Sequence, residues 1–113
     1  GLHVVVLGAA YRGGVKETAF SGVFPLVESL RARGAHVLVH DPLYAPGELE
    51  NLGFRPYALG SPADAAIIQT DHAEYRSLTP TDLPSVRALI DGRRATDPTA
   101  WDGVIHRVIG RPA

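Results

Sequence analysis

The sequence contains no cysteine and no apolar run long enough to cross a bilayer. The missing thiols exclude disulfides, thiolate metal sites and a cysteine nucleophile within the 113 residues. A membrane-spanning helix needs roughly 20 apolar residues, and no charged-then-apolar signal segment opens the residues given. We therefore expect a cytoplasmic protein with no membrane contact.

The sequence also has little excess of charge of either sign. Eleven Lys and Arg stand against twelve Asp and Glu, which leaves a formal net charge of −1. Such a balance gives no indication of a nucleic acid or an anionic membrane as partner, so any anion site must come from local geometry. The length predicts a single domain over residues 1–113. Because the sequence opens abruptly on an apolar strand, we expect it to be a piece of a longer protein.

Apolar strands alternate with helical segments along the chain. Between the first two strands, apolar residues recur at helical spacing from Ser21, the expected N-cap, to Gly34. A short helix capped by Asp71 is expected to run to Leu78. Strands are expected at residues 3–7, 35–40, 54–59, 65–70, 86–90 and 104–109. The pattern predicts an α/β fold with a Rossmann-like, doubly wound, mostly parallel sheet of five to six strands and helices on both faces.

The first strand runs directly into a glycine turn, Gly8 to Gly14, and then into the first helix. This order is typical of an anion site, because free backbone N–H groups and the helix dipole favour negative charge there. Backbone groups near Gly13 and Gly14 are expected to take part. A G-x-G-x-x-G dinucleotide motif would also need glycine at position 10, where the sequence has Ala10. The alternative is a turn that only joins strand to helix.

Two arginines follow strands at the same expected edge of the sheet. Arg12 comes after the first strand, and Arg93 comes after the strand that ends near Ile90. Because the carboxyl ends of parallel strands share one edge, the two guanidinium groups are predicted to clamp a phosphate. Solvated surface arginines are the alternative.

Several acids and a histidine also lie at expected strand ends. Asp41 follows the second strand, where an acid either binds ribose hydroxyls or forms a turn, and Pro42 after it favours the turn. His72 at a helix start is interpreted as a capping or surface group. The five histidines are scattered through the sequence, so no zinc site is expected.

Four segments together resemble the C-terminal, UDP-binding domain of the UDP-glucose/GDP-mannose dehydrogenase family. They are residues 7–12 (LGAAYR), Asp41-Pro42, residues 70–75 (TDHAEY) and residues 90–93 (IDGR) with 109–111 (IGR). The resemblance covers essentially the whole chain, and the order and spacing of the segments make it specific.

The resemblance implies a substrate-binding role for this domain. Members of the family oxidise the C6 alcohol of a nucleotide sugar to a carboxylate with NAD, which gives a uronic acid. It implies that Tyr11, Arg12 (where the family usually has Lys) and Arg93 contact the UDP part of a UDP-sugar substrate. No catalytic residue, no NAD-binding residue and no metal ligand is assigned to this chain.

The rest of the enzyme would lie outside these residues. The resemblance implies an N-terminal domain that holds NAD, a central dimerisation helix, and a catalytic cysteine and lysine in those parts, so the intact enzyme is expected to be a homo-oligomer. A family arginine that reaches NAD is replaced by Ala19, and the Ser-Pro pair that follows it is Ser21-Gly22. The Asp71-His72 pair favours the N-acetylhexosamine type of dehydrogenase.

Two other functions are compatible with the residues. One is a non-catalytic regulatory module that binds a nucleotide or CoA, supported by the Rossmann-like pattern and by Ala19. The other is an interdomain scaffold whose arginines form salt bridges to a neighbouring domain. Both would leave Arg12 and Arg93 without a diphosphate ligand from a sugar nucleotide.

Overall fold

Six strands form one sheet in the computed structural model, which describes residues 1–19 and 21–108. The strands are β1 (His3–Leu7), β2 (His36–His40), β3 (Arg55–Pro56), β4 (Ala65–Ile68), β5 (Ala88–Asp91) and β6 (Ile105–Val108). The α-helices are α1 (Val23–Ala32) and α2 (Pro46–Asn51), and two short 3₁₀ helices are η1 (Ala73–Ser77) and η2 (Pro98–Ala100).

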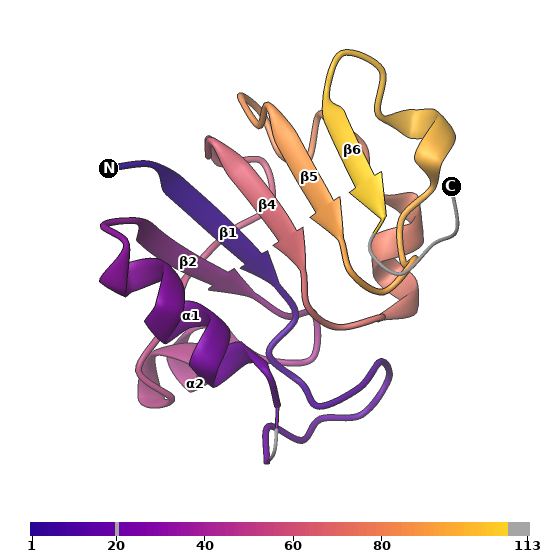
Figure 1. Cartoon of the computed structure of the whole chain (residues 1–113). Helices are drawn as coiled ribbons and strands as arrows, with labels where there is room; N and C mark the ends of the chain where they lie inside the picture. The colour runs from indigo at the N-terminus through magenta and orange to yellow at the C-terminus, as the bar shows by residue number, and fades with distance from the viewer. Residues whose placement is uncertain (20, 109–113) are drawn as a thin grey trace.

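The strand order is β3-β2-β1-β4-β5-β6, and every pair in the described sheet is parallel. The predicted Rossmann-like, doubly wound sheet is therefore confirmed. Strand order reverses between β1 and β4, where Val5 pairs with Leu38 on one side and with Ala66 on the other. All strands point toward one edge, and the loop that follows β1 extends beyond it (Figure 1).

The sheet carries a separate apolar core on each face. In β1, Val5 and Leu7 face one core while Val6 faces the other, as the two-residue period of a strand requires. The face of Val6 packs against α1 and α2 through Val23, Val27, Leu49 and Phe54. The opposite face is covered by η1 and by loops through Tyr57, Tyr75, Leu78, Leu83 and Trp101. Buried on both faces, β1 fits the continuous apolar run in its sequence.

Three predicted boundaries need correction. Gly22, not Ser21, is the N-cap of α1, although the Ser21 hydroxyl does accept the Val23 N–H at 3.2 Å. The segment after β4 is the 3₁₀ helix η1, and His72 precedes it as cap in place of Asp71. The expected strand at 54–59 shrinks to the two-residue edge strand β3, because Pro56 has no N–H to donate.

Two further predictions concern the chain ends and membranes. Residues 109–111 of the resemblance lie outside the described residues, and β6 ends at Val108. Within the described ranges the longest helix, α1, has ten residues. None of the described helices combines the length and the apolar character that a bilayer crossing would need.

Candidate functional site

The candidate site lies at the carboxyl edge of the sheet, beside the point where strand order reverses. In open parallel sheets ligands bind in the crevice outside this point. The loop after β1, residues 8–22, and the segment after β4, residues 69–72, meet there. Thr70 joins them, since its hydroxyl donates to the Ala10 carbonyl at 2.8 Å. The site is therefore built from segments about 60 residues apart in the sequence.

The first half of the β1 loop is bound by the Asp41 carboxylate. Asp41 Oδ2 accepts the N–H of Ala9 at 2.8 Å and that of Ala10 at 3.1 Å. It also accepts Nε2–H of His72 at 2.8 Å, and both side chains are fully buried. A buried carboxylate needs such donors to offset its desolvation. Asp41 thus joins the ends of β1, β2 and β4.

The second half of the β1 loop is bound by the segment after β4. The N–H of Gly13 donates to Asp71 Oδ1 at 2.7 Å, and the N–H of Gly14 donates to His72 Nδ1 at 3.1 Å. With Nδ1 accepting and Nε2 donating to Asp41, the hydrogen bonds assign His72 the neutral Nε2–H tautomer. His72 holds the cap position before η1, as one of the two sequence readings had it, but its side chain is buried and connects Asp41 to the β1 loop, so the surface reading is wrong.

These contacts overturn the prediction of a backbone anion cradle. The amides of Ala9, Ala10, Gly13 and Gly14 all donate to Asp41, Asp71 or His72. The amide of Tyr11 donates to the Glu17 carbonyl at 2.6 Å. The protein's own groups thus take the N–H groups of residues 9–11, 13 and 14, which leaves the side chains of the loop as candidates for contact with an anion.

The glycines of the loop are required by close packing against the next strand end. A Cβ on Gly8 would collide with Thr70, and the φ of Gly8 is +109°. A Cβ on Gly13 would collide with the backbone carbonyl of Asp71. The two positions that match the dinucleotide motif thus serve close contact between the loop after β1 and the segment after β4.

Asp41 does form the predicted turn, but that turn is a small part of its role. Its Oδ1 accepts the Leu43 N–H at 2.9 Å, two residues along the chain. The residue is only 3% exposed, and four donors already contact its two oxygens. The carboxylate is therefore closed to ribose hydroxyls.

The loop that carries Arg93 is folded around a second buried carboxylate, Asp91. Asp91 Oδ1 accepts the amides of Arg93 at 3.0 Å and Ala95 at 3.1 Å. Its Oδ2 accepts the amide of Thr96 at 2.8 Å and the Thr96 hydroxyl at 2.5 Å. Burial alone would raise the pKa of Asp91, but these hydrogen bonds outweigh it and hold the pKa below its usual value. The ionised carboxylate fixes where Arg93 leaves the sheet.

The three predicted ligand residues lie on these two loops. Tyr11 and Arg12 are exposed at the tip between the two anchored halves of the β1 loop, with Tyr11 54% exposed. Arg93 is also exposed, and its Nη2 lies 4.0 Å from Oδ1 of Asp71, the atom that accepts the Gly13 amide. The structure brings the Arg12 and Arg93 loops together through Asp71.

An open pocket of about 500 Å³ lies beside Arg93. Three guanidinium groups, those of Arg76, Arg93 and Arg94, line it together with the one carboxylate of Asp71. Arg76 comes from η1 and donates to the Thr96 carbonyl at 3.1 Å. The sequence analysis overlooked Arg76, although its place in a helical turn after β4 puts it at the same edge as Arg93.

The remainder of the β1 loop turns toward α2. Lys16 Nζ lies 2.6 Å from Glu48 Oε2 and 5.3 Å from the centre of the Tyr44 ring. Ala19 is exposed, and its amide donates to Glu17 Oε1 at 2.9 Å. This part of the loop presents no cation at position 19.

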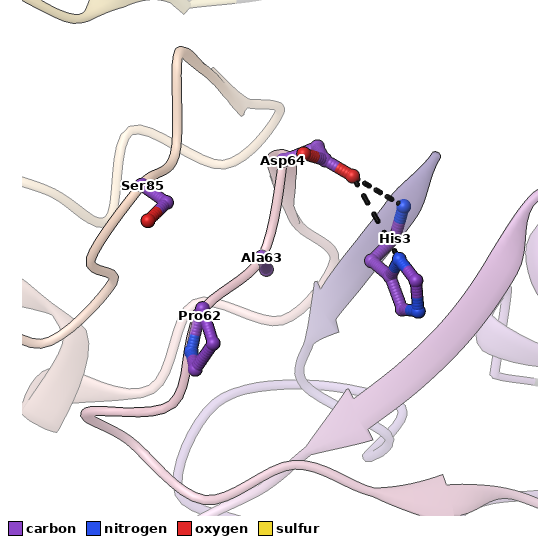
Figure 2. A pocket seen from close by; sticks show the side chains of 5 residues that line it. All are labelled: His3, Pro62, Ala63, Asp64 and Ser85. Atoms are coloured by element: carbon purple, nitrogen blue, oxygen red, sulfur yellow. Dashed lines mark hydrogen bonds and ion pairs between the residues drawn. The ribbon is translucent and has the colours of Figure 1, made fainter. Parts of the chain in front are cut away.

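A second pocket lies at the opposite, amino edge of the sheet (Figure 2). It measures about 300 Å³ and is lined by His3, Pro62, Ala63, Asp64 and Ser85. Asp64 Oδ2 accepts the His3 N–H at 2.7 Å, which ties the start of β1 to the start of β4. The pocket contains no arginine or lysine and lies away from the strand ends where α/β sheets bind ligands. Within the described part of the chain, no three His, Asp or Glu side chains gather as a metal site requires.

Comparison with known proteins bears on the same residues. The model of the UDP-glucose/GDP-mannose dehydrogenase family, UDP binding domain, matches residues 5–98. The chain is 36% identical over 112 residues to the UDP-N-acetyl-D-mannosamine dehydrogenase of Pyrococcus horikoshii, covering 96% of this chain and 25% of that protein. It is 29% identical over 127 residues to a UDP-glucose 6-dehydrogenase of Bacillus subtilis, covering 100% and 27%.

Solved structures show the same similarity in three dimensions. The UDP-D-ManNAc dehydrogenase of Pyrococcus horikoshii aligns with a TM-score of 0.70 at 30% identity, over 97% of this chain and 26% of that one. The UDP-N-acetyl-mannosamine dehydrogenase of Staphylococcus aureus aligns with a TM-score of 0.77 at 21% identity, over 96% and 26%, which concerns the fold alone. The chain spans about a quarter of the length of the curated relatives it matches.

Proposed function

This chain belongs to the UDP-glucose/GDP-mannose dehydrogenase family, whose UDP-binding domain it matches, and on that premise we propose that it holds the UDP end of a nucleotide-sugar substrate. The observation that carries the proposal is the pair of exposed arginines, Arg12 and Arg93, on loops that Asp71 links at the carboxyl edge of the sheet.

In this proposal, guanidinium groups recognise the diphosphate. Arg12 and Arg93 neutralise its charge, since a planar guanidinium can donate two parallel hydrogen bonds to phosphate oxygens. Tyr11, with more than half of its surface exposed, packs against the nucleotide. The charge of the pocket beside Arg93, three arginines against Asp71, favours an anion on the same side. The buried carboxylates Asp41 and Asp91 hold the two loops that carry Arg12 and Arg93.

The glycine loop of this chain does not fit the diphosphate of NAD. Its amides are taken by Asp41, Asp71 and His72, and Ala19 stands where the family has an arginine that reaches NAD. We therefore place NAD on another part of the protein. When bound there, NAD would accept the hydride released from the sugar.

For the whole protein we propose an NAD-dependent nucleotide-sugar 6-dehydrogenase that oxidises a C6 alcohol to a carboxylate. This chain would be its C-terminal domain, with the NAD-binding and central domains in the same polypeptide and a homo-oligomeric assembly in the cytoplasm. Binding energy from UDP would hold the distant C6 in place for hydride transfer. The 36% identity with a UDP-N-acetyl-D-mannosamine dehydrogenase favours an N-acetylhexosamine as the sugar.

The proposal is tested by titrating UDP against the intact protein that carries this domain. Arg12→Ala and Arg93→Ala are each expected to weaken UDP binding by about tenfold or more, roughly 1.4 kcal/mol. Calorimetric titration at fixed ionic strength measures the effect.

Arg33→Ala is the matched control. Arg33 is an exposed arginine at the C-terminal end of α1, so its removal changes the net charge equally at a distance from the carboxyl edge. UDP affinity should stay at the parent value in this variant. Parent-like affinity in both Arg12→Ala and Arg93→Ala would refute the proposal and leave the interdomain scaffold as the better reading.

A further inference from the structure

The buried pair Asp41 and His72 contacts the backbone on both sides of the exposed Tyr11–Arg12 tip. Asp41 Oδ2 accepts the amides of Ala9 and Ala10, the two residues before the tip. His72 Nδ1 accepts the amide of Gly14, two residues after Arg12. The hydrogen bond between the two side chains closes this arrangement into a ring of contacts around the tip.

We propose that Asp41 and His72 are positioning residues for UDP recognition, fixing the tip of the β1 loop so that Tyr11 and Arg12 are presented at the carboxyl edge of the sheet. The inference rests on the proposed function and adds two residues with a defined task. Asp41 positions the two residues that precede the tip, Ala9 and Ala10, and His72 positions Gly14, which follows it. Asp71, which accepts the Gly13 amide and lies 4.0 Å from Arg93, sets the distance to the second arginine.

The geometry distinguishes this role from general stabilisation of the fold. The anchors are single hydrogen bonds to four particular amides of one loop, and the tip between them is exposed. Fixing a loop before the ligand arrives lowers the ordering cost of binding. An arginine on an unanchored loop would lose conformational entropy each time the ligand binds. The pair therefore contributes to affinity through Arg12.

Two substitutions of His72 separate its two hydrogen bonds. In His72→Gln the side-chain amide can reach Asp41 as Nε2 does, but no acceptor remains for the Gly14 N–H. In His72→Asn the carbonyl oxygen can take the place of Nδ1 and accept from Gly14, while the donor to Asp41 is lost. If the hydrogen bond from the Gly14 amide to residue 72 contributes to UDP binding, the Asn variant should retain more UDP affinity than the Gln variant.

The decisive experiment is a double-mutant cycle on the intact protein, with UDP as the probe. Arg12→Ala, His72→Gln and the combined variant are titrated beside the parent. His72→Gln alone should weaken UDP binding about three- to tenfold. Once Arg12 is absent its position no longer matters, so adding His72→Gln to Arg12→Ala should have little further effect, and the two changes should be strongly non-additive.

Tyr57→Phe is the control for general destabilisation. Tyr57 is buried, and its hydroxyl donates to the carbonyls of Ser61 and Asp82, neither of which lies on the β1 loop. It should lower thermal stability and leave UDP affinity unchanged. Parent-like UDP affinity in His72→Gln, or independent effects that multiply with Arg12→Ala, would overturn the positioning role. Equal affinities of the Gln and Asn variants would also overturn it, and this comparison holds even if one combined variant does not fold.

Failure of the proposed function gives a different pattern. In that case Arg12→Ala and Arg93→Ala bind UDP as the parent does, whatever the His72 variants show. If the arginine variants lose affinity and His72→Gln does not, the proposed function stands and only the positioning inference falls.

Discussion

The two loops that present Arg12 and Arg93 are both folded around a buried aspartate, but they are held in different ways. Asp91 accepts donors that all come from within five residues of itself. Asp41 accepts donors from residues 31 or 32 positions away, on two other strand ends, as well as from Leu43 nearby. The donors to Asp91 are local, although Arg76 and His106 also contact Thr96 of that loop, whereas most donors to Asp41 come from other strand ends.

The difference indicates where each arginine gets its position. The donors that fold the Arg93 loop around Asp91 follow that residue directly in the chain. The Arg12 loop is shaped only after β1, β2 and β4 are side by side. We therefore expect loss of the Asp41 hydrogen bonds to alter the structure at several strand ends of the site. Loss of the Asp91 hydrogen bonds should alter mainly the loop that carries Arg93.

The largest expected effect is on the free energy of unfolding when either of the two buried aspartates is substituted. Asp41→Asn turns one acceptor oxygen into a donor among the amides of Ala9 and Ala10 and the ring of His72, in a fully buried position. We expect a loss of about 3 kcal/mol in the free energy of unfolding, as for other broken buried pairs. Asp91→Asn should cost about 1–2 kcal/mol, because its donors can regroup within one short loop.

Denaturant unfolding of the two variants, followed by circular dichroism, measures the difference. Equal losses would contradict the distinction between a local and an assembled loop. A larger loss in Asp91→Asn would reverse it.

A smaller change in the free energy of unfolding is expected when a glycine of either loop is replaced by alanine. A Cβ on Gly13 would collide with the Asp71 carbonyl, whereas a Cβ on Gly92 meets only the Ile68 carbonyl at an ordinary 3.5 Å. Gly13→Ala should therefore cost about 1–3 kcal/mol, like other overpacked sites, and weaken UDP binding. Gly92→Ala should change stability by less than about 0.5 kcal/mol.

The same unfolding assay and UDP titration check both glycine variants. If Gly13→Ala binds UDP with parent affinity, contact between the two loops does not set the position of Arg12.

The smallest expected effect is on how the free energy of unfolding changes with pH. The pKa of Asp91 is held below its usual value by hydrogen bonds. A carboxyl whose pKa is lower in the folded chain stabilises the fold fully at neutral pH, and this stabilisation is lost as the pH falls below about 4. The free-energy gap between the parent and Asp91→Asn should therefore narrow from pH 5 downward. A constant gap over that range would exclude the ionised form of Asp91 as the group that holds the loop.

The sequence was sufficient for the local parts of this molecule. Apolar runs located β1, β2, β4 and β5, Gly34 marked the end of α1, and the resemblance identified the family. The Asp91 turn lies wholly within one segment, so its form is accessible from spacing. The alternation of strands and helices predicted a doubly wound, mostly parallel sheet, and the structure supplies its strand order.

The predictions that were wrong concern contacts between segments that are far apart in the sequence. Nothing in the spacing of Asp41 and His72 shows that one buried hydrogen bond joins them, or that they take the amides of the β1 loop. Free amides were therefore expected near Gly13 and Gly14, where the protein supplies its own carboxylate and imidazole. Arg12 and Arg93 were selected because each follows a strand at the carboxyl edge, and Tyr11 was selected from the resemblance; their contact with UDP stays a prediction.

The central claim is that side chains, not backbone amides, recognise the phosphates at this edge. A crystal structure of the intact protein with UDP tests it most directly. We predict phosphate oxygens on the guanidinium groups of Arg12 and Arg93, with the amides of Gly13 and Gly14 still bound to Asp71 and His72. Phosphate oxygens on those two amides, with Asp71 and His72 displaced, would contradict the account.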